Sequence, residues 1–174
     1  MFKKHRIHDV IKYPDPLLAK PAAAVTEFDG ELAQLVDDMF DSMYAAQGIG
    51  LAAPQIAISK RITVIDVSFK ERPEDKLALI NPEVIESEGK QVEEEGCLSL
   101  PDIRAKVQRA EWVKVRAQNV KGEYFEVEGT ELLARALQHE IDHLNGILFI
   151  DHLSRLKRDL VLRRIKKLQK NGEW

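Results

Sequence analysis

The sequence contains one cysteine and no long hydrophobic segment, and both scarcities limit what the protein can be. With a single cysteine among 174 residues, an internal disulfide framework is excluded. No apolar run approaches the roughly 18 residues that a membrane-spanning helix needs. The basic start, Met1 to Lys4, is not followed by the apolar stretch of a signal peptide. We therefore expect a cytoplasmic protein that binds no membrane.

Hydrophobic periodicity predicts helices near both ends of the chain and strands between them. Apolar residues recur at helical spacing between Asp29 and Ala46. Short β-branched or alternating segments predict strands at 61–67, 77–85, 92–100, 112–118 and 124–128. Thr130 is placed to cap a further helix that Asn145 and Gly146 would end. This order indicates an α+β fold, in which antiparallel β-sheets pack around a central helix and a C-terminal helix follows.

The predicted central helix carries the most informative pattern, H-E-x-x-H, at His139, Glu140 and His143. The spacing of the two histidines places both imidazoles on one helix face, where they can bind one metal ion. Glu140 then lies beside the open side of the metal, where a carboxylate that is not a ligand can take a proton from water and return it. Without further ligands, however, the same residues could be the solvated face of an ordinary helix.

Two histidines leave a catalytic metal site one protein ligand short. Downstream, Phe149 stands where the extended zinc-protease pattern has its third histidine, and the only glutamate after His143 is Glu173. An upstream ligand is therefore favoured, and the candidates are His5, His8, the carboxylates and Cys97. Cys97 follows a glycine near the end of a predicted strand, and a thiolate suits two imidazoles on a first-row metal. A lone cysteine is otherwise usually a small buried hydrophobe.

Three segments resemble, in the same order, the signature motifs of the peptide deformylases. They are G-I-G-L-A-A-P-Q at 48–55, E-G-C-L-S at 95–99 and Q-H-E-I-D-H at 138–143. The resemblance runs from about Val10 to about Ser154. It implies removal of the N-formyl group from the formylmethionine of nascent polypeptides, with release of formate. It also implies one divalent metal, with Fe²⁺ expected, although a Cys/His₂ site also accepts Zn²⁺, Ni²⁺ or Co²⁺.

The resemblance assigns the reacting groups residue by residue. Cys97, His139 and His143 hold the metal, and water takes the fourth position. Glu140 carries the proton from that water to the departing amine. Negative charge develops on the former carbonyl oxygen, and the Gln55 side-chain amide and the backbone N–H of Leu98 are expected to donate to it.

Other positions are assigned by the resemblance to the substrate or to support of the site. Ile49 and Gly50 hydrogen-bond the peptide like an added strand, and Arg104 lies near the peptide's exit. The methionine pocket is expected to be lined by Leu132, Arg135 and Ala136, with Glu93 nearby. We expect the stem of Arg135 to cover the pocket wall while its charged head stays in water. Arg109 is expected to pair with Glu95 as a structural brace.

Charge is unevenly distributed along the chain. From Ser154 onward there are eight Lys/Arg and two acidic residues, a balance of +6, so residues 1–153 carry −9 of the total of −3. We predict one catalytic domain over 1–153 and a basic amphipathic helix over 154–174 that belongs to the same domain. Its apolar face consists of Leu156, Leu160, Val161, Ile165 and Leu168. That face could pack on the domain, or the helix could dock on the ribosome where the substrate emerges. No DNA binding is expected.

Two alternative functions stay open on the sequence. The chain could be a different hydrolase, such as an endopeptidase. It could also be a metal-stabilised binding module without catalysis, whose site is closed by a fourth protein ligand from His5, His8, His152 or a carboxylate.

Overall fold

The computed structural model describes residues 6–174, so His5 lies outside the described part of the chain. A five-stranded antiparallel sheet has the order β1-β2-β3-β6-β7, and β4 and β5 form a separate two-stranded sheet. The strands are β1 (Gly50–Ala52), β2 (Ile62–Ile65), β3 (Leu77–Glu88), β4 (Gln91–Cys97), β5 (Leu100–Arg109), β6 (Trp112–Gln118) and β7 (Tyr124–Thr130). The helices are α1 (Gly30–Ala45), α2 (Glu131–Leu144) and α3 (Arg155–Lys170), with short 3₁₀ turns η1 (Pro16–Ala19), η2 (Ala53–Ile56), η3 (Pro73–Asp75) and η4 (Phe149–His152).

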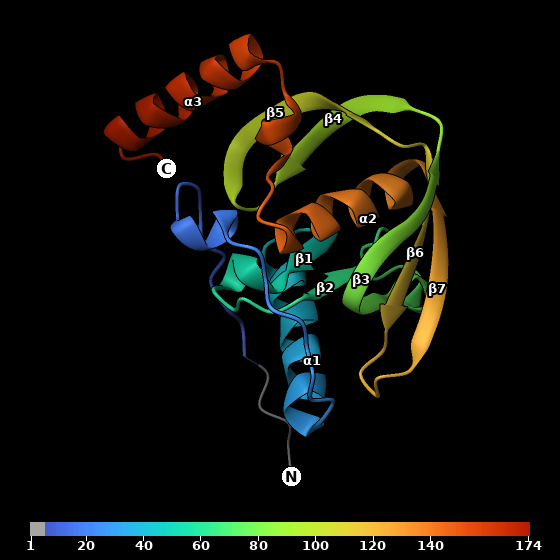
Figure 1. Ribbon diagram of the computed structural model, residues 1–174. Coiled ribbons are helices and arrows are strands. Elements are labelled where there is room, and N and C mark those ends of the chain that lie inside the picture. Colours follow the sequence, from blue (N-terminus) through green and yellow to red (C-terminus); the bar gives the residue numbers. More distant parts are fainter. Residues whose placement is uncertain (1–5) are drawn as a thin grey trace.

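Helix α2 lies at the centre of the molecule, as Figure 1 shows, with the β4–β5 sheet over one side and the five-stranded sheet beside it. Its residues Ala134, Leu137 and Ile141 are buried against Leu79 and Val115 of the larger sheet. The burial of this apolar stripe fixes which side of α2 faces the sheet. The predicted α+β architecture, with sheets around a central helix and a helix at the C-terminal end, is confirmed.

The prediction of one strand over 92–100 was wrong, because the chain reverses at Leu98 and Ser99 and a further strand, β5, begins at Leu100. Pro101 lies inside β5, although a proline cannot donate to a β-ladder. The ladder is irregular here: Cys97 pairs with Leu100 and Gly96 with Arg104, so Pro101 has no paired partner in the register. A bulge of this kind tolerates proline, and it places the side chain of Cys97 at the end of its strand.

Helix α2 begins and ends close to the predicted positions, but the predicted N-terminal cap forms only in part. Thr130 occupies the N-cap position, yet its side chain makes no capping hydrogen bond. At the other end, Asn145 is the C-cap and Gly146 follows with φ +75°. A Cβ at Gly146 would lie 2.5 Å from the carbonyl oxygen of Ala19, so the tight turn after α2 requires glycine.

Helix α1 and strand β2 hold the segment that leads into β1. The side chain of Asp29 caps α1 by accepting from the N–H of Leu32. Just after β2, the buried Asp66 accepts a 2.5 Å hydrogen bond from the hydroxyl of Tyr44 on α1. The backbone N–H of Asp66 donates to the carbonyl of Ile49 at 2.8 Å. Asp66 therefore connects α1 to the backbone immediately before β1.

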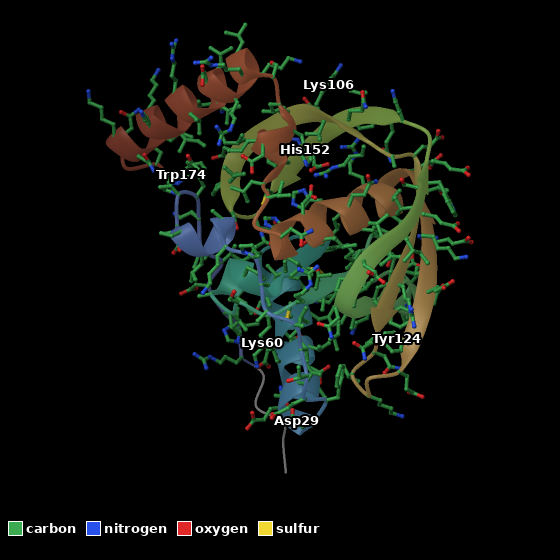
Figure 2. All side chains as sticks on the ribbon, in the orientation of Figure 1. Asp29, Lys60, Lys106, Tyr124, His152 and Trp174 are labelled. Carbon is green, nitrogen blue, oxygen red and sulfur yellow. The ribbon has the colours of Figure 1, made fainter. Side chains whose placement is uncertain are left out.

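The C-terminal helix packs on the body through only part of its apolar face. Ile165 is buried, and Val161 and Leu168 are partly buried against the same cluster. Leu156 and Leu160 are 71% and 54% exposed, so only part of the predicted apolar face packs on the domain. After the helix, the indole Nε1–H of Trp174 donates to the carbonyl of Tyr13, next to η1, where Figure 2 labels Trp174.

Across residues 6–174, the structure contains no helix that is long and apolar enough to span a membrane.

Replacement of Tyr44 by phenylalanine is expected to lower the free energy of unfolding by about 2 kcal/mol, the scale of a hydrogen bond to a charged group. Burial raises the pKa of Asp66, but hydrogen bonds from Tyr44, Ser68 and Lys70 outweigh burial and hold the pKa below its usual value. The ionised carboxyl thus contributes stability at neutral pH that is lost as pH falls through its folded pKa. Denaturant titrations at several pH values should show that the difference in unfolding free energy between the wild type and Tyr44→Phe becomes smaller below about pH 4.

The matched control is Tyr124→Phe, because Tyr124 is 65% exposed on β7. It should leave stability unchanged at every pH. Equal stability of the Tyr44→Phe variant and the wild type at pH 7 would contradict the role given to the Asp66 hydrogen bond.

Candidate metal centre

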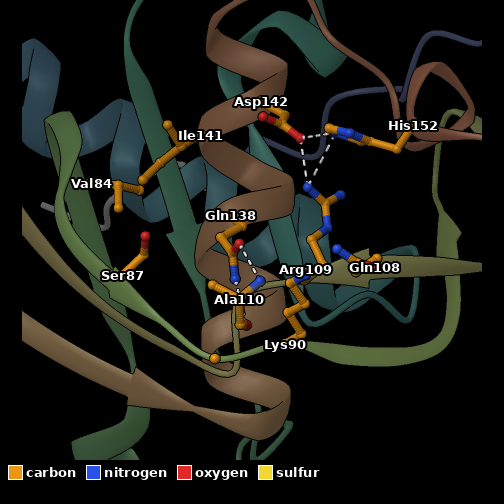
Figure 3. Close-up of a pocket in the computed structure, with 11 residues that line it drawn as sticks. Val84, Ser87, Lys90, Gln108, Arg109, Ala110, Gln138, Ile141, Asp142 and His152 are labelled. Atoms are coloured by element: carbon orange, nitrogen blue, oxygen red, sulfur yellow. Dashed lines mark hydrogen bonds and ion pairs between the residues drawn. The ribbon is translucent and has the colours of Figure 1, made fainter.

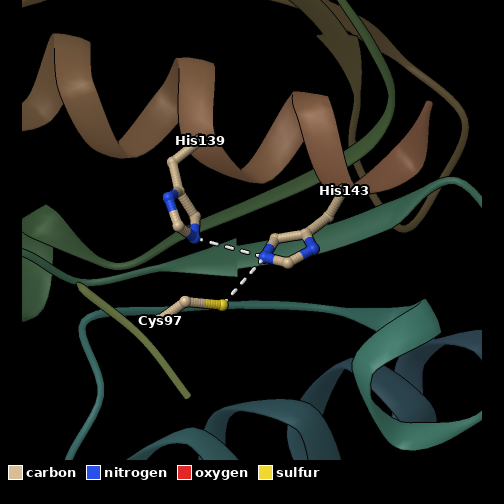
Figure 4. Close-up of side chains that lie close together, drawn as sticks. All are labelled: Cys97, His139 and His143. Atoms are coloured by element: carbon tan, nitrogen blue, oxygen red, sulfur yellow. Dashed lines mark hydrogen bonds between the residues drawn. The ribbon is translucent and has the colours of Figure 1, made fainter. Parts of the chain in front are cut away.

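Cys97, His139 and His143 come together from two elements, and Figure 4 shows their three side chains converging on one point. The Nε2 atoms of His139 and His143, one helical turn apart on α2, are 3.2 Å apart. The Sγ atom of Cys97, at the end of β4, lies 3.3 Å from Nε2 of His143. All three ligand atoms lie within 4.8 Å of one another.

These distances fit a single metal ion. Metal–nitrogen bonds of about 2.1 Å and a metal–sulfur bond of about 2.3 Å at tetrahedral angles separate the donors by about 3.4 to 3.6 Å. The observed 3.2 and 3.3 Å separations are close to that range. Within residues 6–174 the cluster has three members, one fewer than a closed structural site requires.

The other histidines named as possible fourth ligands lie elsewhere or outside the described chain. The backbone N–H of His8 donates to Ser42 Oγ, and its Nε2 is 4.0 Å from Asp38. Nε2 of His152 is 2.7 Å from Asp142 Oδ2. Neither belongs to the ligand cluster. The arrangement therefore leaves one side open, as a catalytic metal site does.

Glu95 orients His139. Its Oε2 lies 2.6 Å from Nδ1 of His139, so Nδ1 donates to the carboxylate and Nε2 is directed to the cluster. The expected pairing with Arg109 is present, with Nε 3.0 Å and Nη2 2.6 Å from the two carboxylate oxygens. Burial raises the pKa of Glu95, but hydrogen bonds and charges from His139 and Arg109 outweigh it and hold the pKa far below its usual value. Glu95 is therefore a buried anion.

The two imidazoles differ in their protonation. Burial lowers the pKa of His139, but Cys97 and Glu95 outweigh burial and raise it well above its usual value. Burial and the charges of His139 and Arg109 lower the pKa of His143. The neutral form, which binds metals, is therefore favoured for His143 and disfavoured for His139.

Glu140 lies beside the ligands in an environment opposite to that of Glu95. It is 4% exposed, and its Oε2 is buried with no hydrogen-bond partner among the described residues. Burial, together with the charge of Glu95, raises the pKa of Glu140 to about 7. A carboxyl with such a pKa and one oxygen without a partner can both accept and release a proton near neutral pH.

Gln55 is held at the far side of Cys97. Its Oε1 accepts from the N–H of Ala52 at 2.9 Å, and its Nε2 donates to Ser99 Oγ at 3.1 Å. Nε2 also lies 3.6 Å from Cys97 Sγ. The side-chain amide is therefore fixed with its N–H groups toward the thiol. Ser99 was not expected to contribute, and its place in the E-G-C-L-S segment is the sequence signal that could have indicated it.

A cavity of about 760 Å³ opens over the cluster of Cys97, His139 and His143. It brings together nearly every residue that the sequence assigned to the site: Ile49, Gly50, Gln55, Cys97, Leu98, Arg104, Leu132, Arg135, Ala136, His139 and Glu140. His143, which lies deeper, does not line it, and neither do Glu93 and Arg109. Residues from β1, the β4–β5 turn and α2 thus form one continuous wall.

Two charged positions differ from expectation. The head of Arg135 is not in water: the side chain is 5% exposed, and its Nη1 donates to Glu95 Oε1 at 2.7 Å. The counter-charge of Glu95 offsets part of the cost of removing the guanidinium from water. Glu93 does not line the cavity, whereas Glu94 does. Arg104 is exposed, and its Nε lies 3.6 Å from Oε2 of Glu94.

A second hollow of about 390 Å³ lies against a different face of α2, at Gln138, Ile141 and Asp142, as Figure 3 shows. Here the guanidinium of Arg109 donates to Asp142 Oδ2 at 2.6 Å. Asp142 was not among the expected site residues, although it belongs to the Q-H-E-I-D-H segment. Arg109 therefore connects Glu95, behind His139, to α2 itself.

The fold and the site define a class of protein. A central helix bearing H-E-x-x-H, a cysteine from a neighbouring strand and a carboxyl poised near neutral pH are typical of a metal-dependent hydrolase.

Comparisons with known proteins identify the family. The family model described as polypeptide deformylase matches residues 7–159. A peptide deformylase from Acidobacterium capsulatum is 70% identical over 97% of this chain and 99% of its own length. Among solved structures, a peptide deformylase from Legionella pneumophila is 46% identical with a TM-score of 0.89, covering 96% of this chain and 98% of that one. One from Thermus thermophilus is 38% identical with a TM-score of 0.85, covering 92% and 94%.

The chain belongs to the polypeptide deformylase family, hydrolases that act on the formyl amide of N-terminal methionine. The family resemblance inferred from the three motifs is confirmed.

A substitution at Gly50 tests whether β1 must approach Glu140 as closely as it does. A Cβ at Gly50 would lie 2.6 Å from Glu140 Oε1 and 3.0 Å from its Cδ. Gly50→Ala should therefore displace the carboxyl and lower kcat for formate release at least tenfold, while metal content stays the same. Metal analysis and a formate assay on a short formylmethionyl peptide measure both. Gly30→Ala is the control, since a Cβ there meets nothing within 4 Å. Unchanged kcat in Gly50→Ala would show that this close contact is not needed.

Proposed function

We propose that Glu140 is the general base and acid in hydrolysis of the formyl amide, and that Cys97, His139 and His143 hold the metal. The observation that carries the proposal is the buried, unpaired Oε2 of Glu140 beside the three-ligand cluster. When bound, a divalent metal supplies Lewis acidity, which polarises a carbonyl and lowers the pKa of water. The Cys/His₂ donors suit Fe²⁺, which we expect, as well as Zn²⁺, Ni²⁺ or Co²⁺.

In this proposal each protein group has one task. Glu140 takes a proton from the attacking water and delivers it to the nitrogen of the departing methionine. The Gln55 amide and the Leu98 N–H donate to the formyl oxygen as negative charge develops on it. The C–N bond breaks, and formate and the free amino terminus result.

The substrate is an N-formylmethionyl nascent peptide. Ile49 and Gly50 lie at the edge of the five-stranded sheet, where a peptide backbone can add as a further strand. Leu132, Ala136 and the aliphatic stem of Arg135 offer apolar surface to the methionine side chain. Arg104, exposed at the mouth, contacts the peptide where it leaves the cavity.

Glu140→Gln should keep metal content while lowering kcat about 10²- to 10⁴-fold, because glutamine has the same shape and cannot accept the proton. Metal analysis and formate release from a formylmethionyl peptide provide the measurement. Near-normal turnover in Glu140→Gln would refute the assignment.

Cys97→Ser should have the opposite effect on metal content, because loss of the thiolate should lower metal affinity. Product analysis also separates the endopeptidase alternative: a deformylase releases formate and leaves internal amides intact, whereas cleaved internal amides would favour the peptidase.

We further propose that α3 belongs to the same domain as residues 1–153 and presents a basic surface to the ribosome. The burial of Ile165 supports the first part. The second rests on the exposed basic residues Arg163, Arg164, Lys166 and Lys167. Contacts of such side chains with RNA phosphates release counterions, so the interaction should weaken steeply with salt.

Reversing these four charges should reduce co-sedimentation with ribosomes at low salt and spare turnover of a short free peptide. The control reverses four exposed lysines outside the helix, namely Lys12, Lys60, Lys106 and Lys121. If the α3 variant co-sediments as strongly as the wild type, the docking proposal is wrong. If the control variant loses as much binding, the attraction is not specific to α3.

A further inference from the structure

The position of Cys97 relative to the two histidine ligands depends on how the β4–β5 sheet is held against α2. Cys97 ends β4, and the two-stranded sheet is not part of the five-stranded one. His139 and His143 are carried by α2. No shared sheet therefore fixes the thiol against the imidazoles, and side chains that bridge α2 to β4 and β5 must do so.

Arg135 makes such a bridge from α2 to both strands. Its Nη1 donates to Glu95 Oε1 on β4 at 2.7 Å, and its Nη2 donates to the carbonyl of Val107 on β5 at 2.9 Å. Its Nε lies 3.3 Å from Gln91 Oε1, also on β4. The planar guanidinium thus engages three acceptors in fixed directions, which a lysine could not reproduce.

Glu95 receives Arg135 and the ligand His139 on different oxygens. Oε1 accepts from Arg135, and Oε2 accepts from Nδ1 of His139 at 2.6 Å. Arg109 also contacts both oxygens, but it comes from β5. Arg135 is consequently the group on α2 that prevents the carboxylate from rotating away from the imidazole on the same helix.

We propose that Arg135 is a positioning residue for the metal centre. It acts through Glu95 on the orientation of His139, and through Val107 on the place of the strand pair that carries Cys97. Its charged head takes no part in recognising the methionine side chain, because all three of its nitrogens are directed to β4 and β5. The inference rests on the proposed ligand set Cys97, His139 and His143.

The test replaces Arg135 by methionine, which keeps an apolar stem of similar length on the cavity wall and removes the guanidinium. Apparent Co²⁺ affinity is measured by competition with a chelator, together with the Co²⁺–thiolate absorption band and the kcat and KM for a formylmethionyl peptide. We expect Co²⁺ affinity to fall about 10- to 100-fold, as for other partners of metal ligands. The kcat should fall with it, and KM should change little. Arg116→Met, at an exposed position on β6, is the matched control and should change none of these values.

A double-mutant cycle with Glu95→Gln tests the route of the effect. In the Glu95→Gln background, Arg135→Met should weaken Co²⁺ binding far less than in the wild type, because the carboxylate through which it acts is gone. In Arg135→Met alone, Glu95 keeps Arg109 and His139 as partners, so no buried charge is left unpaired. In Glu95→Gln alone, Arg135 loses its carboxylate partner, and the double variant removes that unpaired guanidinium. An equal loss in both backgrounds would overturn the proposal.

Two further outcomes are decisive. If Arg135→Met binds Co²⁺ with wild-type affinity and only KM rises, Arg135 belongs to the substrate pocket and the inference is wrong. Failure of the proposed ligand set would look different, since the wild type would then show no Co²⁺–thiolate band and Cys97→Ser would keep the Co²⁺ affinity of the wild type.

Discussion

The buried carboxylate of Glu95 is the interaction on which the site depends. Removing such an ion from water costs several kcal/mol unless close partners compensate. Arg109, Arg135 and His139 provide that compensation at 2.6 to 3.0 Å. The three partners come from β5 and α2, while Glu95 belongs to β4. One carboxylate therefore holds the separate two-stranded sheet to the central helix and orients the imidazole of His139 at the same time.

Two glutamates within the site differ because their surroundings differ. Glu95 has cationic partners that hold its pKa far below the usual value. Glu140 is equally buried, but its Oε2 has no partner among the described residues, and its pKa rises to about 7. A permanently charged carboxylate suits support of a ligand, and one that titrates near neutral pH suits proton transfer. The same residue type therefore has opposite pKa shifts on neighbouring elements.

Close packing around Glu140 constrains the backbone opposite it. Gly50 leaves no room for a Cβ beside the Glu140 carboxyl, and a Cβ at Gly48 would lie 2.7 Å from Leu98. The glycines of the first motif thus let β1 approach both α2 and the turn after Cys97. This approach brings the edge of the five-stranded sheet beside Glu140 and Leu98.

The sequence alone determined the family, the α+β class and the identity of α2. These follow from local signals: the spacing of His139 and His143, the apolar period of the helices, and three short motifs in order. Strand β5 was missed, because a proline inside a strand is tolerated only at an irregular pairing, and pairing is a long-range property. The head of Arg135 was expected in water for a similar reason. Its burial depends on Glu95, 40 residues away in the chain. Apart from the expected pair of Glu95 and Arg109, only the tertiary structure decided which charges meet, since compensation of a buried ion is set by distance in space.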